Sequence, residues 1–150
     1  MEGSAELLTI ERVAVLQRVE IFRGAPGHTL VAVARLVDEV RVEPGETFIQ
    51  RGDVEDWLFV VADGKVRAHI GEHTLTERGP GEVVGELALL APAARSASVT
   101  AIDHSLLLRL RRQPFEELLE DRGEIAQAVI TSLARRLQEL ADQDAGAGDR

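Results

Sequence analysis

The stretch GELALLAPAARSAS, residues 85–98, joins a glycine–glutamate pair to a lone arginine across a spacer of small and apolar residues. Gly85 has no Cβ, so a ligand could lie close to the backbone there. Arg95 carries a fixed charge and forked donors that suit phosphate oxygens, and Ser96 adds a hydroxyl donor. The stretch therefore predicts a pocket for a small phosphorylated ligand.

The residues that follow Gly85 extend this prediction. A short helix over residues 86–90 would turn its free backbone N–H groups, including those of Leu87 and Ala88, towards an anion. Glu86 would repel an anion, but it could accept a hydrogen bond from a ligand hydroxyl. A phosphate and a hydroxyl held close together describe a ribose phosphate.

Outside this stretch, the chain divides into a β-rich centre and helical ends. Between residues 40 and 110, short apolar runs alternate with turn residues roughly every 8 to 12 positions, which is typical of an antiparallel sandwich or barrel. The clearest predicted hairpin is WLFVVADGKVRAHI, with a turn at Asp63-Gly64. Apolar residues at helical spacing predict helices within residues 8–37.

The C-terminal part has helical periodicity as well. Pro114 suits the first turn of a helix, and a second helix carries a single apolar seam up to residue 140. The seam residues are Ile125, Val129, Leu133, Leu137 and Leu140. The seam must cover either the β core or a partner chain. Residues 141–150 lack periodicity, so we expect a disordered tail there.

Composition excludes several function classes. The chain of 150 residues fits one domain, and its net charge of −9 opposes broad contact with nucleic acid. It has no cysteine, and its apolar runs fall short of the roughly 20 residues of a membrane helix, so we expect a cytoplasmic protein without disulfides or cysteine-ligated metal. No combination of residues predicts catalysis, and His69 and His73 lack companions at metal-ligand spacing.

The stretch at 85–98 resembles the phosphate-binding cassette of cyclic nucleotide-binding domains, and the resemblance runs from about residue 8 to 140. It implies an α+β, mainly β fold: an eight-stranded antiparallel β-roll (jelly-roll) over 40–110, flanked by N-terminal helices within 8–37 and two C-terminal helices within 114–140. It implies cAMP as the ligand, with cGMP less favoured, and no other cofactor or metal. The effector would be another domain or a partner chain, and a second copy of this chain is one such partner.

The resemblance also assigns residue roles. Glu86 matches the acceptor for the ribose 2′-hydroxyl, and Arg95 matches the ligand of the cyclic phosphate. Gly85, Leu87 and Ala88 match backbone contacts, and Ser96 matches the small or hydroxyl residue after the arginine. Arg136 matches an arginine that reaches over the base, although a shift of one residue would substitute Arg135.

Two alternatives stay open. Glu86 and Arg95 could pair with each other and close an empty pocket, which would leave an interaction module that binds a partner through its C-terminal helix. An enzyme acting on a nucleotide is the least favoured class.

Overall fold

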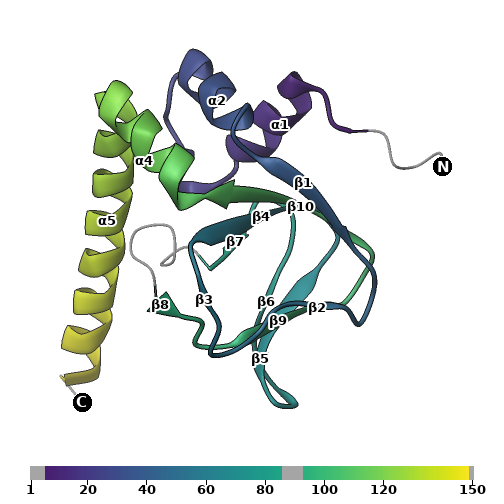
Figure 1. Cartoon of the computed structure of the whole chain (residues 1–150). Helices are drawn as coiled ribbons and strands as arrows, with labels where there is room; N and C mark the ends of the chain where they lie inside the picture. The colour runs from purple at the N-terminus through teal and green to yellow at the C-terminus, as the bar shows by residue number, and fades with distance from the viewer. Residues whose placement is uncertain (1–5, 86–92, 149–150) are drawn as a thin grey trace.

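The structure, a computed structural model, describes residues 6–85 and 93–148. Within them, an antiparallel β-roll lies beneath a layer of short helices, and one long helix runs along its side (Figure 1). The helices are α1 Thr9–Leu16, η1 Glu20–Phe22, α2 Gly27–Ala34, α4 Arg112–Asp121 and α5 Gly123–Gly148. The strands are β1 Asp38–Val42, β2 Thr47–Ile49, β3 Val54–Glu55, β4 Trp57–Asp63, β5 Val66–Ile70, β6 His73–Arg78, β7 Val83–Val84, β8 Ala93–Ala94, β9 Ser98–Ala101 and β10 Ser105–Arg111.

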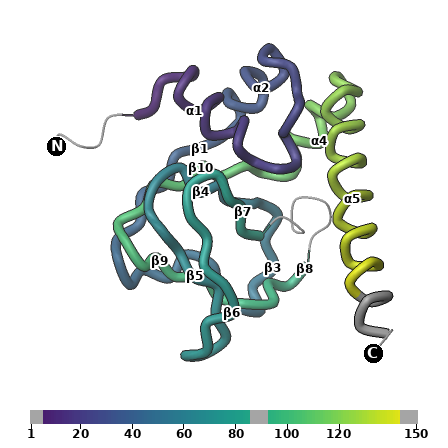
Figure 2. The backbone as a smooth tube through the Cα atoms, turned by 180° about the vertical axis from the view of Figure 1, so that it is seen from behind, coloured from purple at the N-terminus to yellow at the C-terminus, as the bar shows by residue number. Residues whose placement is uncertain are grey.

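The described strands form two sheets of four and one ribbon of two. The strand orders are β1-β10-β4-β7, β2-β9-β5-β6 and β3-β8, and all pairs are antiparallel. Figure 2 shows the same roll from behind, with β3 and β8 on the side where α5 runs. The predicted fold class, a mainly β roll between N-terminal and C-terminal helices, is confirmed.

The hairpin predicted over WLFVVADGKVRAHI is wrong. Gly64 does have a positive φ of 97°, as a tight turn requires, but β4 pairs with β10 and β7, whereas β5 pairs with β6 and β9. The chain therefore passes at Gly64 from one sheet to the other. The true hairpin in this region is β5–β6, which turns next to Gly71.

The reason lies in the double-sided burial of β4. Leu58 and Val60 face the helical layer, while Phe59 and Val61 face the interior of the roll. A strand buried on both faces belongs in the middle of a sheet between two partners. The alternating side chains of β4 therefore pack into two apolar clusters, one on each face, and do not form a half-exposed hairpin strand.

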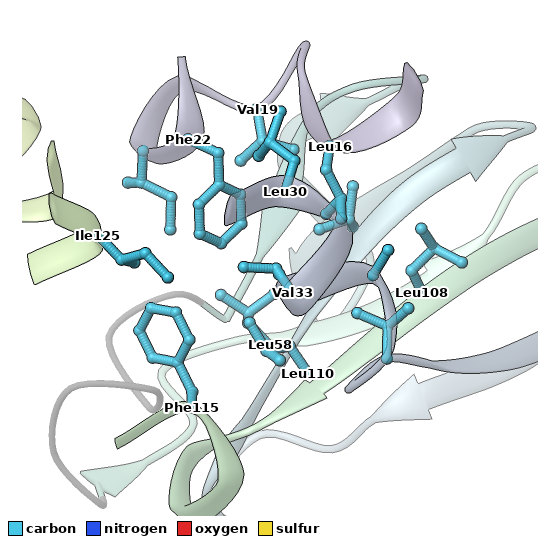
Figure 3. Close-up of a cluster of buried hydrophobic side chains, with 14 of the residues drawn as sticks. Leu16, Val19, Phe22, Leu30, Val33, Leu58, Leu108, Leu110, Phe115 and Ile125 are labelled. Carbon is cyan, nitrogen blue, oxygen red and sulfur yellow. The ribbon is translucent and has the colours of Figure 1, made fainter. Parts of the chain in front are cut away.

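The larger apolar cluster joins the helices to the outer face of the first sheet. The rings of Phe22 and Phe115 meet in an edge-to-face arrangement with centroids 6.1 Å apart. Figure 3 shows them at the side of the cluster next to Ile125. Ile125 of α5 packs beside them and is 1% exposed. The N-terminal helices and the start of α5 thus share one core.

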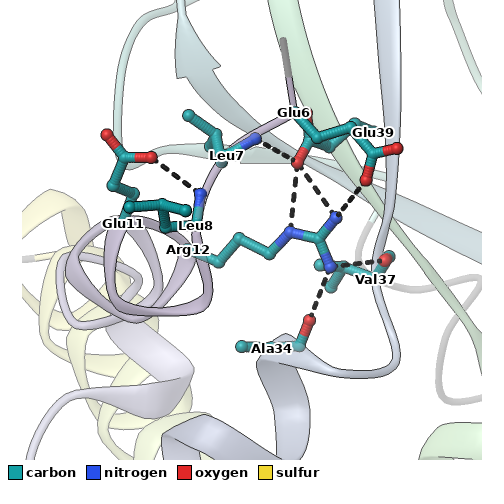
Figure 4. Close-up of polar contacts among 8 residues, drawn as sticks. All are labelled: Glu6, Leu7, Leu8, Glu11, Arg12, Ala34, Val37 and Glu39. Atoms are coloured by element: carbon teal, nitrogen blue, oxygen red, sulfur yellow. Dashed lines mark hydrogen bonds and ion pairs between the residues drawn. The ribbon is translucent and has the colours of Figure 1, made fainter.

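A polar contact attaches the N-terminal helix to the roll. The Arg12 guanidinium donates from Nη2 to Glu39 Oε2 at 2.9 Å and from Nη1 to the carbonyl oxygens of Ala34 and Val37 at 3.0 and 3.4 Å (Figure 4). The Glu39 side chain is only 8% exposed. One arginine therefore connects α1 to the end of α2 and to β1.

The apolar seam of α5 divides into two parts. Ile125 and Val129 are buried, but Leu137 and Leu140 are 67% and 57% exposed. The helix also continues to Gly148, where the sequence predicted a tail from residue 141. Only the first part of the seam covers the core of this chain.

The start of α5 carries a carboxylate with a perturbed pKa. The pKa of Glu124 lies below its ordinary value, chiefly because its own backbone N–H donates a hydrogen bond to the carboxylate and also because the Thr29 hydroxyl donates one. A lowered pKa stabilises the folded state above the pKa of the unfolded chain, and this contribution disappears as the pH falls through the folded value.

Thr29→Val is expected to raise the pKa of Glu124 towards its ordinary value. Valine removes the 2.9 Å hydrogen bond at a fully buried position without changing the side-chain shape greatly. The titration can be followed by NMR of the Glu124 side-chain carboxyl carbon. Thr29→Ser keeps the hydroxyl and should keep the low pKa. Equal titration of Thr29→Val and wild type would show that this bond is unimportant.

Candidate functional site

The candidate site is built around the guanidinium of Arg95. The residue lies just after β8 and is 7% exposed. Its backbone is fixed to the turn before β3, since Arg95 N–H donates to Asp53 and Gly52 N–H donates to Arg95, both at 2.8 Å. The side chain therefore starts from a rigid position.

Three protein acceptors hold the guanidinium. Nε donates to Glu55 Oε1 at 2.9 Å, Nη1 donates to the carbonyl oxygen of Gly85 at 3.2 Å, and Nη2 donates to that of Trp57 at 2.5 Å. These bonds orient the charged group and leave part of its donor capacity for a ligand. Two of the three acceptors are backbone carbonyls, so Glu55 supplies the balancing charge.

Gly85 is required by the same arrangement. Its φ is +77°, a conformation that side chains other than glycine rarely adopt, and a Cβ atom there would overlap the Arg95 guanidinium. The sequence predicted that the absence of a Cβ would allow close approach to the backbone. The group that lies close to Gly85 in the structure is the Arg95 side chain.

A cavity of about 190 Å³ adjoins these residues. Its walls come from β2, β5, β6, β7 and β9 and from the segments at Gly85 and 95–97. Its lining residues are Ile49, Ala68, Thr76, Arg78, Val83, Val84, Gly85, Arg95, Ser96, Ala97 and Val99. The structure thus brings Gly85, Arg95 and Ser96 to one cavity whose walls are partly apolar.

Other predicted site residues are placed differently. Glu86, Leu87 and Ala88 lie outside the described residues, as does the short helix expected over 86–90. Arg136 is absent from the described lining of the cavity. Its Nε donates to Glu20 Oε1 of η1 at 2.8 Å. The Arg135 guanidinium lies 3.8 Å from the other carboxylate oxygen of Glu20. In this structure both arginines of α5 face the N-terminal helices.

Sequence reasoning missed Glu55, Thr76 and Arg78. Glu55 follows a polar turn, and nothing in the local pattern indicates that it pairs with an arginine 40 positions away. Thr76 and Arg78 lie on β6, where polar residues face inwards instead of apolar ones. This inverted alternation could have indicated pocket residues. Finding them requires the strand register, which the sequence alone does not supply.

The described part of the chain contains neither a metal centre nor a membrane-spanning helix. No group of three or more histidine, cysteine or carboxylate residues there is close enough to hold a metal ion. Among the same residues, none of the helices combines the length and hydropathy needed to cross a bilayer.

Comparison with known proteins fits this geometry. A family model described as a cyclic nucleotide-binding domain matches residues 39–122, which is more than half of the chain. The chain belongs to the cyclic nucleotide-binding domain family. The match includes β2 to β10, all but the first residue of β1, and both Gly85 and Arg95, so the cavity lies within the family domain.

Individual relatives of this cyclic nucleotide-binding domain are moderately similar. A CRP-like cAMP-activated global transcriptional regulator from Mycobacterium tuberculosis is 32% identical, over 83% of this chain and 58% of the relative. The N-terminal domain of a transcriptional regulator from Streptomyces coelicolor A3(2) superposes with a TM-score of 0.79 at 33% identity, covering 86% of this chain and 94% of that domain. The regulatory domain of Toxoplasma gondii protein kinase A, solved with cAMP, gives 0.67 at 28% identity, covering 81% and 46%.

The chain spans 58% of the length of the mycobacterial regulator and 46% of a cyclic AMP receptor protein from Thermus thermophilus. These relatives therefore contain sequence beyond the region that they share with this chain.

Gly85→Ala is expected to weaken ligand binding by about 10-fold or more, because a methyl group would displace the guanidinium from the Gly85 carbonyl. Gly24→Ala is the matched control, since Gly24 has a similar φ of 88° and nothing within 4 Å of its added Cβ. Calorimetric titration of both variants with cAMP measures the difference. If both variants bind like wild type, the close contact with Gly85 has no role in binding.

Proposed function

We propose that this chain is a cyclic nucleotide-sensing regulatory domain that binds cAMP in the cavity beside Arg95. The observation that carries the proposal is a buried arginine, fixed through its backbone and by Glu55, that lines a cavity within a domain of this family. Arg95 binds the cyclic phosphate, and Ser96 contributes a hydroxyl at the same edge of the cavity.

The residues beyond the described part complete the proposed site. Glu86 accepts the ribose 2′-hydroxyl, and the backbone N–H groups of Leu87 and Ala88 contact the phosphate. Arg136 could contact the base only after leaving Glu20, so ligand binding would then break the contact between α5 and η1. The ligand is bound without being changed.

The output of the domain is a movement of its C-terminal helices. α5 is held to the core through Ile125 and Val129 and to η1 through Arg136, while its later apolar residues are exposed. A change at these few contacts can reorient the helix without opening the roll. The receiver of this signal is another domain or a partner chain.

The test is thermal unfolding of the chain with cAMP, cGMP or 5′-AMP. A ligand at about 100 times its Kd stabilises the folded state by roughly 2.7 kcal/mol, which should raise Tm by about 5 to 10 °C for a domain of this size. A shift with a cyclic nucleotide and none with 5′-AMP supports the proposal. Absence of any shift at millimolar nucleotide contradicts it.

A second function is favoured by the exposed part of α5. Leu137 and Leu140 could bind a partner chain or a second copy of this chain without any ligand. The measurement that separates the two functions is the molecular mass in solution, with and without cAMP, for wild type and for a Leu137→Ser/Leu140→Ser variant. Association that is independent of nucleotide and lost in the variant would support the interaction module.

A further inference from the structure

The strand β6 presents polar residues to the interior of the roll. In the β5–β6 pair, Arg78 lies opposite Val66 and Thr76 lies opposite Ala68. Directly opposite residues of an antiparallel pair share a face, and Val66 and Ala68 belong to the interior apolar cluster. On the other face of β6, Leu75 is 51% exposed. The usual alternation, apolar inside and polar outside, is therefore inverted here.

Arg78 has no carboxylate to balance its charge among the described residues. Its Nη1 donates to the Thr76 hydroxyl at 2.5 Å and to the Glu77 carbonyl at 3.2 Å. Both acceptors are neutral, and the residue is partly buried. Burial of an unbalanced charge costs free energy, so the position favours an external group that accepts hydrogen bonds from the guanidinium.

The same cavity holds both arginines, but in different electrostatic settings. Arg95 is paired with Glu55 and lies against Gly85, whereas Arg78 reaches the cavity from β6. Under the proposed function Arg95 takes the cyclic phosphate. Arg78 would then meet a different part of the ligand, and the part that remains is the base.

The two purine bases offer different groups to a guanidinium. Guanine carries two neighbouring acceptors, O6 and N7, which match the arginine fork. Adenine carries the N7 acceptor beside an amino donor, so it offers only one acceptor to the guanidinium. Its amino N–H group would face the remaining N–H groups of the arginine. A guanidinium at the base therefore favours guanine over adenine.

We propose that Arg78 is a specificity-determining residue that contacts the purine base and raises the affinity for cGMP relative to cAMP. The affinity for cAMP then exceeds the affinity for cGMP by a smaller factor than it would if Arg78 did not contact the base. This inference rests on the proposed function, because it assigns Arg78 to the base of a nucleotide whose phosphate is bound by Arg95.

The experiment measures the Kd values of cAMP and cGMP by calorimetry for wild type, Arg78→Leu, Arg78→Lys and Arg67→Leu. Leucine suits the apolar surroundings of Val66 and Ala68, and lysine keeps the charge without the fork. Arg67 is the matched control, because it lies on the neighbouring strand, bonds to the Thr74 hydroxyl and is absent from the described lining of the cavity.

Arg78→Leu is expected to weaken cGMP binding by about 10-fold or more and cAMP binding by less than about 3-fold. Arg78→Lys should recover only part of the cGMP affinity, and Arg67→Leu should bind both nucleotides like wild type. Equal loss of both nucleotides in Arg78→Leu would mean that Arg78 acts only through its charge, and no loss would mean that it does not touch the ligand. Either result overturns the inference but leaves the proposed function standing.

A wild-type protein that binds neither nucleotide would overturn the proposed function, and the inference with it. Unfolding of Arg78→Leu without ligand is measured alongside. A melting temperature close to that of wild type shows that a change in affinity arises in the pocket.

Discussion

An Arg95→Ala variant is expected to bind cAMP at least about 100-fold more weakly than the wild type. The variant loses the proposed charge-assisted contact to phosphate at a position that is 7% exposed, where removal of one partner of a buried charged pair costs about 2 to 5 kcal/mol of binding. The substitution also removes the guanidinium that donates a hydrogen bond to the Glu55 carboxylate in the wild type, and this carboxylate is only 16% exposed. The variant should therefore be less stable than the wild type as well as weaker in cAMP binding.

Trp57 provides the measurement. It is the only tryptophan of the chain, its carbonyl accepts from Arg95, and its ring lies 5.6 and 5.3 Å from the guanidinium carbons of Arg109 and Arg111. A phosphate that engages Arg95 should change the surroundings of Trp57, so titration with cAMP can be followed by its fluorescence. Arg95→Ala should show no saturable change.

Two controls separate binding from stability. Arg95→Lys keeps the charge but cannot reproduce three directed bonds, so its affinity should lie between those of the alanine variant and wild type. Arg67→Ala removes one positive charge on β5, at a residue absent from the described lining of the cavity, and should bind normally. If Arg95→Ala is folded and its affinity is within about 3-fold of wild type, Arg95 is not the phosphate ligand.

Gly64→Ala is expected to destabilise the domain by about 2 to 5 kcal/mol, the largest stability effect that we predict. Alanine at a φ of 97° costs about 1 to 2 kcal/mol, and overpacking adds about 1 to 3 kcal/mol. The added Cβ would lie 2.6 Å from the carbonyl oxygen of His104 and 2.7 Å from Cα of Ser105, both backbone atoms that cannot rotate away.

The matched control is Gly52→Ala. Gly52 has a φ of 93° but open space around the added Cβ, so it isolates the conformational cost from the overlap. Tm should fall by roughly 10 °C in Gly64→Ala and by a few degrees in Gly52→Ala. Equal shifts for the two variants would mean that the segment 104–105 moves aside, and that the transition between the sheets tolerates a side chain.

The local features of the sequence predicted much of this fold. Some signals predict structure from residues that are adjacent in the chain: turn residues, the helical spacing before residue 37 and Pro114. The structure has helices or turns at each of them. The prediction for Gly85 and Arg95 had a similar basis, because the motif contains both residues, and the structure brings them into direct contact.

The features of the fold and of the site that the sequence did not predict depend mainly on the register between distant strands. Asp63-Gly64 was taken for a hairpin because a tight turn looks the same whether its two strands pair with each other or with others. Arg78 was missed because its face is defined only by its pairing with Val66. The end of α5 was placed too early because the helix continues to Gly148 through a segment that lacks apolar periodicity, and that periodicity was the signal used to predict the helix.

The pairing of β1 with β10 has a consequence for synthesis of the chain. Among the described strands, β1 lies at the edge of its sheet and pairs with β10 alone, and Asp38 bonds to Arg109 across 71 positions. Closing so long a loop is slow, and the ladder cannot form on the ribosome until residues 105–111 have emerged. Val40 and Val42 therefore remain without their β10 partners while residues 43–111 are synthesised, and during this interval the nascent chain needs protection from aggregation.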